Sequence, residues 1–335
     1  MVVGGWCVSR AAGRAAPLPA AHGTHDRCAR RCAALSGVAR SCIMASVARR
    51  PHPLRVITLA LLTAVIASAA TPVAAQARPG PLVIVGGGRQ PASLVEEFVR
   101  LAGGAGRARI VVFAMASRDG EVSGEAKAAD FRALGAAARN VWVVREAADR
   151  DSVVRLLDGA TGIWFGGGDQ NRLLAVLAGT RTLDAIVARH RAGAVIGGTS
   201  AGAAVLSTPM ITGAERPAPG RDSTEQWTTI ARDRVVTTTG FPFVTEAVVD
   251  QHFVRRRRHN RLLSLVLAGP VHLGAGIDEG TALIVEPDGG WRVAGESVVV
   301  IYDARRARIT PPDSSALAAT DVRLHVLRAG MRFRP

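Results

Sequence analysis

The sequence has no cysteine beyond position 42. Its four cysteines, at positions 7, 28, 32 and 42, all lie in an arginine-rich stretch without hydrophobic periodicity. The rest of the chain therefore folds without disulfide bonds. A zinc site built on a Cys-x-x-Cys pair is also excluded there, and Cys28 and Cys32 do not have that spacing themselves.

A hydrophobic run long enough to cross a membrane is missing as well. The longest candidate, Val56 to Ala70, has 15 residues, whereas a spanning helix needs about 20. It follows the basic segment 48–55 and is followed by small residues at 73–77. This order is typical of a secretory signal peptide with its cleavage site.

These features predict three segments. Residues 1–43 are interpreted as a translated extension upstream of the true start at Met44, residues 44–77 as a signal peptide, and residues 80–335 as one catalytic domain. We therefore expect export to the periplasm or the extracellular space, with no stable membrane insertion after cleavage. An uncleaved N-terminal anchor is the alternative.

Lysine is nearly absent, and acidic residues are scarce in the N-terminal region. More than half of the formal charge of +15 lies in residues 1–75, which contain nine arginines and a single acid, Asp26. The other 33 basic residues, of which only Lys127 is a lysine, face 26 acidic ones. That balance is only mildly basic, so no nucleic-acid partner is inferred.

Strand-like and helix-like patterns alternate after residue 80. Short apolar runs typical of buried strands are separated by amphipathic segments of helical period, the first of them capped by Ser93. The predicted strands are 81–85, 109–115, 141–144, 161–165 and 192–196, and the predicted helices are 93–101, 124–138, 152–157, 172–177 and 182–191. This alternation predicts an α/β fold with a parallel sheet covered by helices on both faces and ligands at the carboxyl ends of its strands.

The C-terminal part has a different pattern. Residues 207–233 are rich in proline, glycine and charge and are predicted to form a long loop. Residues 234–239 and 245–249 are strand-like. Residues 276–285 and 291–301 are predicted to form β-hairpins that close the sheet.

A third glycine is missing from the first glycine turn, residues 86–88. A dinucleotide-binding fingerprint needs Gly-x-Gly-x-x-Gly, but Gln90 and Pro91 follow Gly88 here. The partial motif is therefore rejected, and neither a cofactor nor a metal is expected.

Ser200 is the candidate nucleophile. It follows the apolar run 192–196 and stands between Gly198 and Gly202, which gives the pattern Gly-x-Ser-x-Gly. In that pattern a sharp turn between a strand and a helix lifts the serine hydroxyl above a parallel sheet. The turn residues Gly198 and Ala201 are expected to present backbone N–H groups to a developing oxyanion. The plainer interpretation is a glycine-rich turn with a capping serine.

A second glycine turn is expected beside the serine. Residues 166–171 follow the predicted strand 161–165, so Gly168 and the polar Gln170 should lie at the same edge of the sheet as Ser200. For Asp169 and Asn171 the simpler expectation is helix capping.

A serine nucleophile needs a base, and the base needs an orienting acid. Of the four histidines beyond Ser200, His252 is predicted to be the base because it follows strand-like residues at an arginine-rich turn; the other three, at 259, 272 and 325, are assigned to the surface or the core. Glu215, at the start of the long loop, is predicted to be the acid. Asp222 and Glu225 are its competitors.

Four motifs occur along the chain in the same order as in the cyanophycinases, and they carry a resemblance to that group. The cyanophycinases belong to the serine peptidase family that also contains aspartyl dipeptidase. They are Gly-Gly-Thr-Ser-Ala-Gly-Ala at 197–203, Gly-Gly-Asp-Gln at 167–170, Asp-Gln-His-Phe at 250–253 with the arginines that follow, and Gly-Ile-Asp-Glu-Gly-Thr-Ala at 276–282. The resemblance spans residues 81–285. It implies a flavodoxin-like fold, similar to class I glutamine amidotransferase domains.

The resemblance also implies roles and a substrate. Ser200 and His252 match the family's nucleophile and base, and the pocket-lining positions are Gln170, Asp250, Gln251, Arg256, Arg258 and Arg261. The implied substrate is cyanophycin, a poly-aspartate with arginine on each β-carboxyl, cleaved to β-Asp-Arg dipeptides through an acyl-enzyme. Arginines suit its carboxylates, and Asp250 would suit its guanidinium groups.

Several alternatives remain at this stage. The run Arg255 to Arg258 is also typical of a solvated basic face. Other candidate functions are an aspartyl or isoaspartyl peptidase with a different substrate, an esterase, and an inactive secreted binding protein. A glutaminase is excluded because it needs cysteine at position 200. The sequence leaves open whether the chain forms a homodimer.

Overall fold

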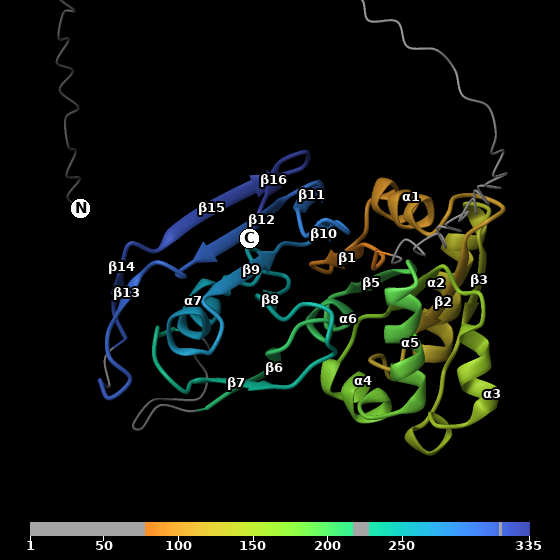
Figure 1. Ribbon diagram of the computed structural model, residues 1–335, viewed down its shortest axis with the longest axis horizontal. Helices are drawn as coiled ribbons and strands as arrows, with labels where there is room; N and C mark the ends of the chain where they lie inside the picture. The colour runs from red at the N-terminus through yellow and green to blue at the C-terminus, as the bar shows by residue number, and fades with distance from the viewer. Residues whose placement is uncertain (1–77, 217–227, 315–316) are drawn as a thin grey trace, which may run out of the picture. The chain divides into compact units, whose positions relative to one another are not determined.

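The computed structural model describes residues 78–216, 228–314 and 317–335. The predicted extension and signal peptide, as well as Asp222 and Glu225, lie outside these residues. Two β-sheets dominate the fold (Figure 1). No helix in the described ranges is long and apolar enough to span a membrane.

The first sheet contains the predicted parallel strands. Its order is β16-β11-β10-β1-β5-β4-β2-β3, and the five strands from β1 to β3 in this order run parallel. The bounds are β1 Leu82–Val85, β2 Arg109–Phe113, β3 Ala137–Asn140, β4 Gly162–Phe165, β5 Val195–Thr199, β10 Thr281–Val285, β11 Trp291–Gly295 and β16 Arg332–Phe333. The hairpin of β10 and β11 extends the sheet beyond β1, so the α/β fold class predicted from the sequence is confirmed.

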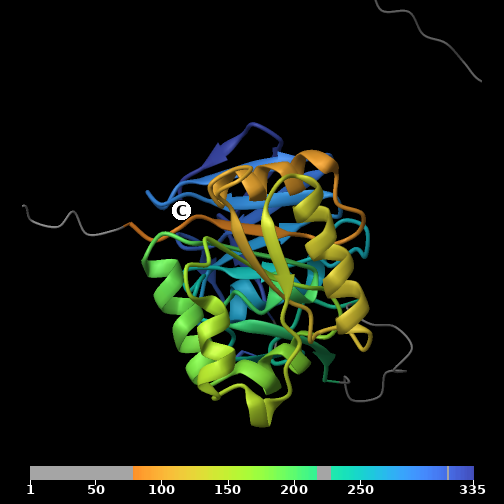
Figure 2. The ribbon, with the colours of Figure 1, turned by 90° about the vertical axis from the view of Figure 1, so that its right-hand side faces the viewer.

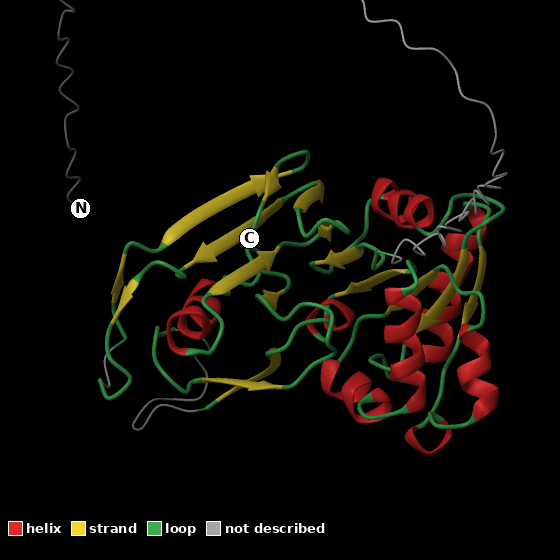
Figure 3. Ribbon diagram, in the orientation of Figure 1, coloured by secondary structure: helices red, strands yellow, loops and turns green. Residues whose placement is uncertain are grey.

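Helices cover both faces of the parallel half (Figures 2 and 3). On one face Phe98 of α1 and Phe131 of α2 pack against Trp164 of β4. On the other face α4 and α5 join the core formed by Ile163 and Phe165. Because both faces are covered, strands such as β4 are buried along their full length and show no alternation of polar and apolar residues. The helices are α1 Ala92–Leu101, α2 Gly120–Ala133, α3 Asp151–Val154, α4 Gln170–Leu177, α5 Arg181–Arg191 and α6 Ala201–Ala204, with 3₁₀ turns η1 Arg145–Ala147 and η2 Arg155–Leu157.

A second sheet, which the sequence did not predict, follows the serine turn in the chain. Its order is β15-β12-β9-β8-β6-β7. One of its faces shares the core of the first sheet, and helix α7 covers the other (Figure 1). The bounds are β6 Met210–Glu215, β7 Val235–Thr238, β8 Val248–Asp250, β9 Leu273–Ile277, β12 Val298–Asp303, β15 Arg323–Arg328 and α7 His259–Ala268, with the small pair β13 Arg308–Ile309 and β14 Ala319–Thr320.

Several local predictions were wrong. Residues 276–285 and 291–301 do not form two hairpins, because β9 and β12 lie in the second sheet and β10 pairs with β11 in the first. The helix predicted at 124–138 ends at Ala133, and Ala137 begins β3. The segment 207–233 is not all loop, because β6 forms an antiparallel pair with β7. The third strand lies at Ala137–Asn140, where it pairs with β2, rather than at 141–144. Helix α1 begins after Pro91, whose φ of −56° suits a helix start, so Ser93 is not its cap.

Candidate active site

Ser200 stands on a strained turn between β5 and α6. Its φ of 54° and ψ of −112° are unusual for a residue other than glycine. A Cβ atom on Gly198 would lie 2.2 Å from the Gly202 carbonyl oxygen, and one on Gly202 would lie 2.1 Å from the Phe165 carbonyl oxygen. Both glycines are therefore required by close backbone packing. The turn has the geometry that the Gly-x-Ser-x-Gly spacing predicts.

His252 is within hydrogen-bonding distance of the serine. Its Nε2 atom lies 2.8 Å from Ser200 Oγ. The residue follows β8, has a φ of 48°, and donates its backbone N–H to the Gly86 carbonyl at 2.6 Å. A Cβ atom on Gly87 would lie 2.4 Å from the imidazole, so this glycine leaves the space that the ring occupies.

Glu279 contacts the other side of the imidazole. Its Oε1 lies 2.6 Å from His252 Nδ1. The next residue, Gly280, donates its N–H to the Gly87 carbonyl at 3.0 Å, and a Cβ atom on Gly88 would lie 2.8 Å from Glu279 Cβ. The glycine turn after β1 thus supports both the histidine and the glutamate. The sequence had suggested no role for these glycines once a dinucleotide site was rejected.

Glu215, the acid predicted from the sequence, lies elsewhere. It belongs to β6, and its Oε1 accepts a hydrogen bond from Arg234 Nη2 at 2.7 Å. The structure therefore brings Glu279, and not Glu215, to His252. The signal available in the sequence was the position of Glu279, which follows the apolar end of a strand and precedes a glycine, Gly280. We had predicted that segment to be a hairpin that only closes the sheet.

Burial determines the protonation state of His252. Desolvation lowers the pKa of His252 below its ordinary value of 6.5, and nearby Arg256 and Arg258 lower it further. The hydrogen bond that His252 Nδ1 donates to Glu279 opposes this by raising the pKa. The net effect keeps the imidazole neutral at pH 7, which is the state that a general base needs.

Asp250 and Arg261 form an internal ion pair. Both side chains are almost completely buried. Arg261 Nε lies 2.7 Å from Asp250 Oδ2, and Arg261 Nη2 contacts Oδ1. The backbone N–H of Gln251 also donates to Oδ1, at 2.7 Å. The expectation that Asp250 holds a guanidinium group and Arg261 a carboxylate of the substrate therefore differs from the structure, in which these two groups bind each other.

Arg256 and Arg258 are the cations near the base. Arg258 donates to the Gln251 carbonyl at 2.7 Å and lies 3.7 Å from Asp250 Oδ1. Burial and the neighbouring arginine Arg261 lower the pKa of Arg258 to about 10. Arg256 is exposed, and no carboxylate of the described residues pairs with it. Because Arg261 already neutralises Asp250, this side of the site has an excess of positive charge and favours an anionic group.

The remaining predicted site residues lie close to these elements. Gln170 donates through Nε2 to the Ile211 carbonyl at 2.8 Å, which ties α4 to β6. Gln251 is buried, and its Oε1 has no hydrogen-bond partner in the ranges that the structure describes. Asp169 caps α4 by accepting the Asn171 N–H at 2.8 Å, so the predicted capping role is confirmed.

The glycines after β4 approach the serine from the neighbouring strand. A Cβ atom on Gly167 would lie 3.5 Å from Ser200 Cβ, and one on Gly168 would lie 2.2 Å from the Ala116 carbonyl. Gly168 also has a φ of 137°. The turn after β4 thus lies beside Ser200 at Gly167 and packs against the Ala116 carbonyl at Gly168.

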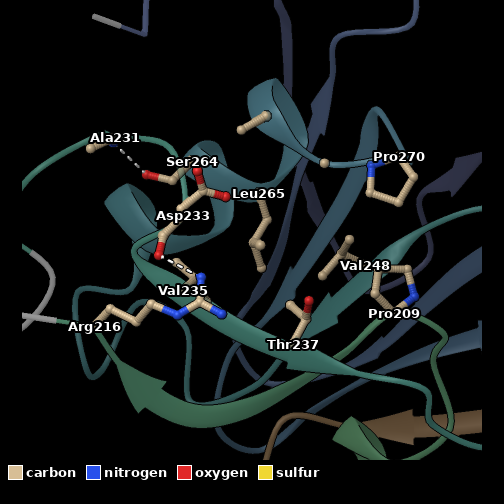
Figure 4. A pocket seen from close by; sticks show the side chains of 12 residues that line it. Pro209, Arg216, Ala231, Asp233, Val235, Thr237, Val248, Ser264, Leu265 and Pro270 are labelled. Carbon is tan, nitrogen blue, oxygen red and sulfur yellow. Dashed lines mark hydrogen bonds between the residues drawn. The ribbon is translucent and has the colours of Figure 1, made fainter. Parts of the chain in front are cut away.

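A cavity of about 290 Å³ lies between β7 and α7 (Figure 4). Ser264 of α7 lines this cavity, and its hydroxyl donates to the Asn260 carbonyl and accepts the Ala231 N–H. No histidine among the described residues lines the cavity. Within the described ranges, no group of three or more histidine, cysteine, aspartate or glutamate residues is arranged to hold a metal ion.

Comparisons with known proteins agree on the type of protein. The sequence model of Peptidase family S51 matches residues 82–291. A cyanophycinase from Nostoc sp. is 37% identical over 237 residues, which cover 69% of this chain and 76% of that protein. A cyanophycinase from Synechococcus elongatus is 36% identical over 253 residues, covering 72% and 73%. One from Geminocystis herdmanii is 33% identical over 263 residues, covering 75% and 92%.

A solved structure supports the fold. The crystal structure of a peptidase from an acI-B1 actinobacterium superimposes with a TM-score of 0.58 at 23% identity, covering 77% of this chain and 98% of that chain. At this identity the likeness shows a shared fold.

Proposed function

The chain belongs to peptidase family S51 and is a serine peptidase, and on this basis we propose that it hydrolyses cyanophycin, a polymer of aspartate and arginine, to β-Asp-Arg dipeptides. The similarity to three cyanophycinases over most of the chain supports the substrate. The observation that carries the chemistry is the chain of hydrogen bonds from Ser200 through His252 to Glu279.

In the proposed mechanism Ser200 Oγ attacks the scissile carbonyl carbon. His252 Nε2 accepts the hydroxyl proton as the new C–O bond forms, and Glu279 stabilises the imidazolium through Nδ1–H. The carbonyl becomes a tetrahedral oxyanion, for which the backbone N–H groups of Gly168 and Ala201 are the proposed hydrogen-bond donors.

The remaining steps release the two products and regenerate the free Ser200 hydroxyl. The imidazolium gives its proton to the leaving nitrogen, so the C–N bond breaks and an acyl-enzyme remains on Ser200. Water then attacks the ester carbonyl while His252 accepts a proton from it. Collapse of this second intermediate returns the proton to Ser200 and liberates the product carboxylate.

Substrate recognition follows from the charges beside His252. Arg256 and Arg258 are proposed to bind the free α-carboxylate of the arginine in the β-Asp-Arg unit next to the scissile bond, where a guanidinium fork forms two parallel hydrogen bonds. Asp250 is engaged with Arg261 and is not available for the substrate guanidinium. We propose that Asp250 and Arg261 instead hold β8 and α7 in place beneath the two binding arginines.

A related peptidase activity is the second candidate. Two arginines beside the base suit a free carboxylate in any aspartyl or isoaspartyl peptide, not only in cyanophycin. Hydrolysis of cyanophycin, isoaspartyl dipeptides and a neutral aryl ester by the purified protein distinguishes the candidates. The proposal requires cyanophycin to be the preferred substrate by kcat/KM. A preference for isoaspartyl dipeptides supports the second candidate, and a preference for the ester contradicts both.

We also propose that the protein is exported. The motivation is the basic segment 48–55, the apolar run 56–70 and the small residues after it. N-terminal sequencing of the protein from its native cells should find a mature start between residues 76 and 78 in the exported fraction. A cytoplasmic protein that retains residues 44–77 would contradict export.

A further inference from the structure

Asp278, the neighbour of Glu279, is a buried carboxylate with two partners on different segments. Its side chain is among the few buried acidic groups, at 8% exposure. Oδ1 accepts the backbone N–H of Arg255 at 2.9 Å, and Oδ2 accepts the hydroxyl of Ser297 at 2.8 Å. The mechanism assigns no role to this group.

These two bonds connect three segments at the site. Arg255 lies in the turn that begins at His252, Asp278 precedes Glu279, and Ser297 lies in the turn between β11 and β12. Ser297 also donates its backbone N–H to Thr281 Oγ1 at 2.8 Å. Thr281 is fully buried. Glu279 is therefore flanked on both sides, at 278 and 281, by residues that Ser297 holds.

Apart from the glycine turn at Gly88, the side chain of Glu279 is partly open to solvent. Its exposed fraction is 35%, and a glutamate has three rotatable side-chain bonds whose freedom must be restricted to keep one geometry. The contact with His252 Nδ1 thus depends on how the backbone at 278–281 sits relative to the turn at 252–258. Asp278 is the side chain that joins these two backbones directly.

We propose that Asp278, together with Ser297, is a positioning residue that sets the distance between Glu279 and His252. The inference rests on the proposed function only in taking Ser200, His252 and Glu279 as the reacting groups. Asp278 acts through its hydrogen bonds and not through its charge. Asn at this position retains an acceptor for the Arg255 N–H and a polar group for Ser297, so it should keep the geometry.

The test uses the mature protein with the variants Asp278→Ala, Asp278→Asn and Ser297→Ala. Asp288→Ala is the matched control, because Asp288 also accepts a backbone N–H in a turn, from Gly290 at 2.9 Å, but it lies in the exposed turn between β10 and β11. The first readout is the rate at which a fluorophosphonate labels Ser200, which needs no cyanophycin. The second is the far-downfield proton NMR resonance of a histidine Nδ1–H bonded to a carboxylate.

Asp278→Ala should lower the labelling rate by about 100-fold and remove the downfield resonance, because a displacement near 1 Å is enough for such a loss. Ser297→Ala should lower the rate by roughly tenfold, while Asp278→Asn and Asp288→Ala should stay within about threefold. If Asp278→Ala fails to fold, Ser297→Ala carries the test.

The inference is overturned if the folded Asp278→Ala variant, or Ser297→Ala where the first does not fold, keeps both the resonance and a labelling rate within about twofold of the parent. A variant that is merely less stable would lose thermal stability and keep both readouts, which also contradicts a positioning role. Failure of the parent to degrade cyanophycin, with labelling intact, would overturn the proposed substrate and leave this inference standing.

Discussion

Glu279 Oε1 lies 2.6 Å from His252 Nδ1, although 27 positions separate the two residues in the sequence. They meet because β8 and β9 are parallel neighbours, with Asp250 opposite Gly276. His252 and Glu279 follow the carboxyl ends of these strands and so reach the same edge of the second sheet. Ser200 comes to them from the carboxyl end of β5 in the first sheet.

Glu279→Gln should lower kcat by about 100-fold or more and leave KM within about threefold, because the carboxylate stabilises the imidazolium and does not bind substrate. Steady-state kinetics measure both constants. Glu215→Gln is the matched control and should keep kcat within about threefold, since Glu215 pairs with Arg234. A larger loss of kcat for Glu215→Gln than for Glu279→Gln would restore the acid predicted from the sequence.

The pH dependence of kcat/KM should follow the titration of His252. Only the neutral imidazole accepts a proton, so activity is present above the pKa and is lost as the pH falls through it. Burial holds the pKa of His252 below 6.5, and the midpoint of the acid limb should therefore lie below pH 6.5.

The variant Arg256→Ala should shift the acid limb of the pH profile in a defined direction. The positive charge of Arg256 lowers the pKa of His252, so its removal should raise that pKa and shift the acid limb to higher pH. Buffers of constant ionic strength are needed because the interaction of exposed charges is screened. A parent midpoint above pH 6.5, or a shift of the variant to lower pH, would contradict the assignment.

Replacement of Arg261 by alanine should lower the stability of the fold, whereas replacement of Arg256 should weaken substrate binding. Arg261→Ala leaves the buried Asp250 carboxylate without its main partner and should destabilise the fold by about 3–5 kcal/mol. Arg256 is exposed, so Arg256→Ala should change the free energy of unfolding by less than about 0.5 kcal/mol while raising KM by roughly tenfold or more.

Urea denaturation and steady-state kinetics of the two variants separate these effects. If Arg261→Ala is as stable as the parent and only its KM rises, Arg261 binds substrate and its pair with Asp250 is not structural. Equal losses of activity at 255, 256 and 257 that disappear at high salt would instead indicate a diffuse basic surface.

Much of the first sheet could be predicted from the sequence. Its parallel strands are buried on both faces, so they appear as short continuous apolar runs such as 161–165, and the glycine turns mark their ends. The turn at Ser200 was predicted for the same reason, since Gly198 and Gly202 are demanded by local packing.

The second sheet and the acid could not be predicted in this way. Strands β7 and β8 overlap the strand-like residues 234–239 and 245–249, but nothing local in them indicates a second sheet. Strand β9 contains two glycines and carries no clear pattern. The parallel pairing of β8 with β9, which delivers Glu279 to His252, is a long-range contact without a local signal. The same holds for Asp250, whose burial against Arg261 depends on the packing of α7.

The most direct test of the account is incubation of the mature protein with purified cyanophycin, with soluble products identified by mass spectrometry. The account predicts release of β-Asp-Arg by the parent, and a loss of at least about 10⁴-fold in the rate for Ser200→Ala with an unchanged circular dichroism spectrum. Failure of the folded parent to release the dipeptide, or release by Ser200→Ala within about tenfold of the parent rate, would contradict it.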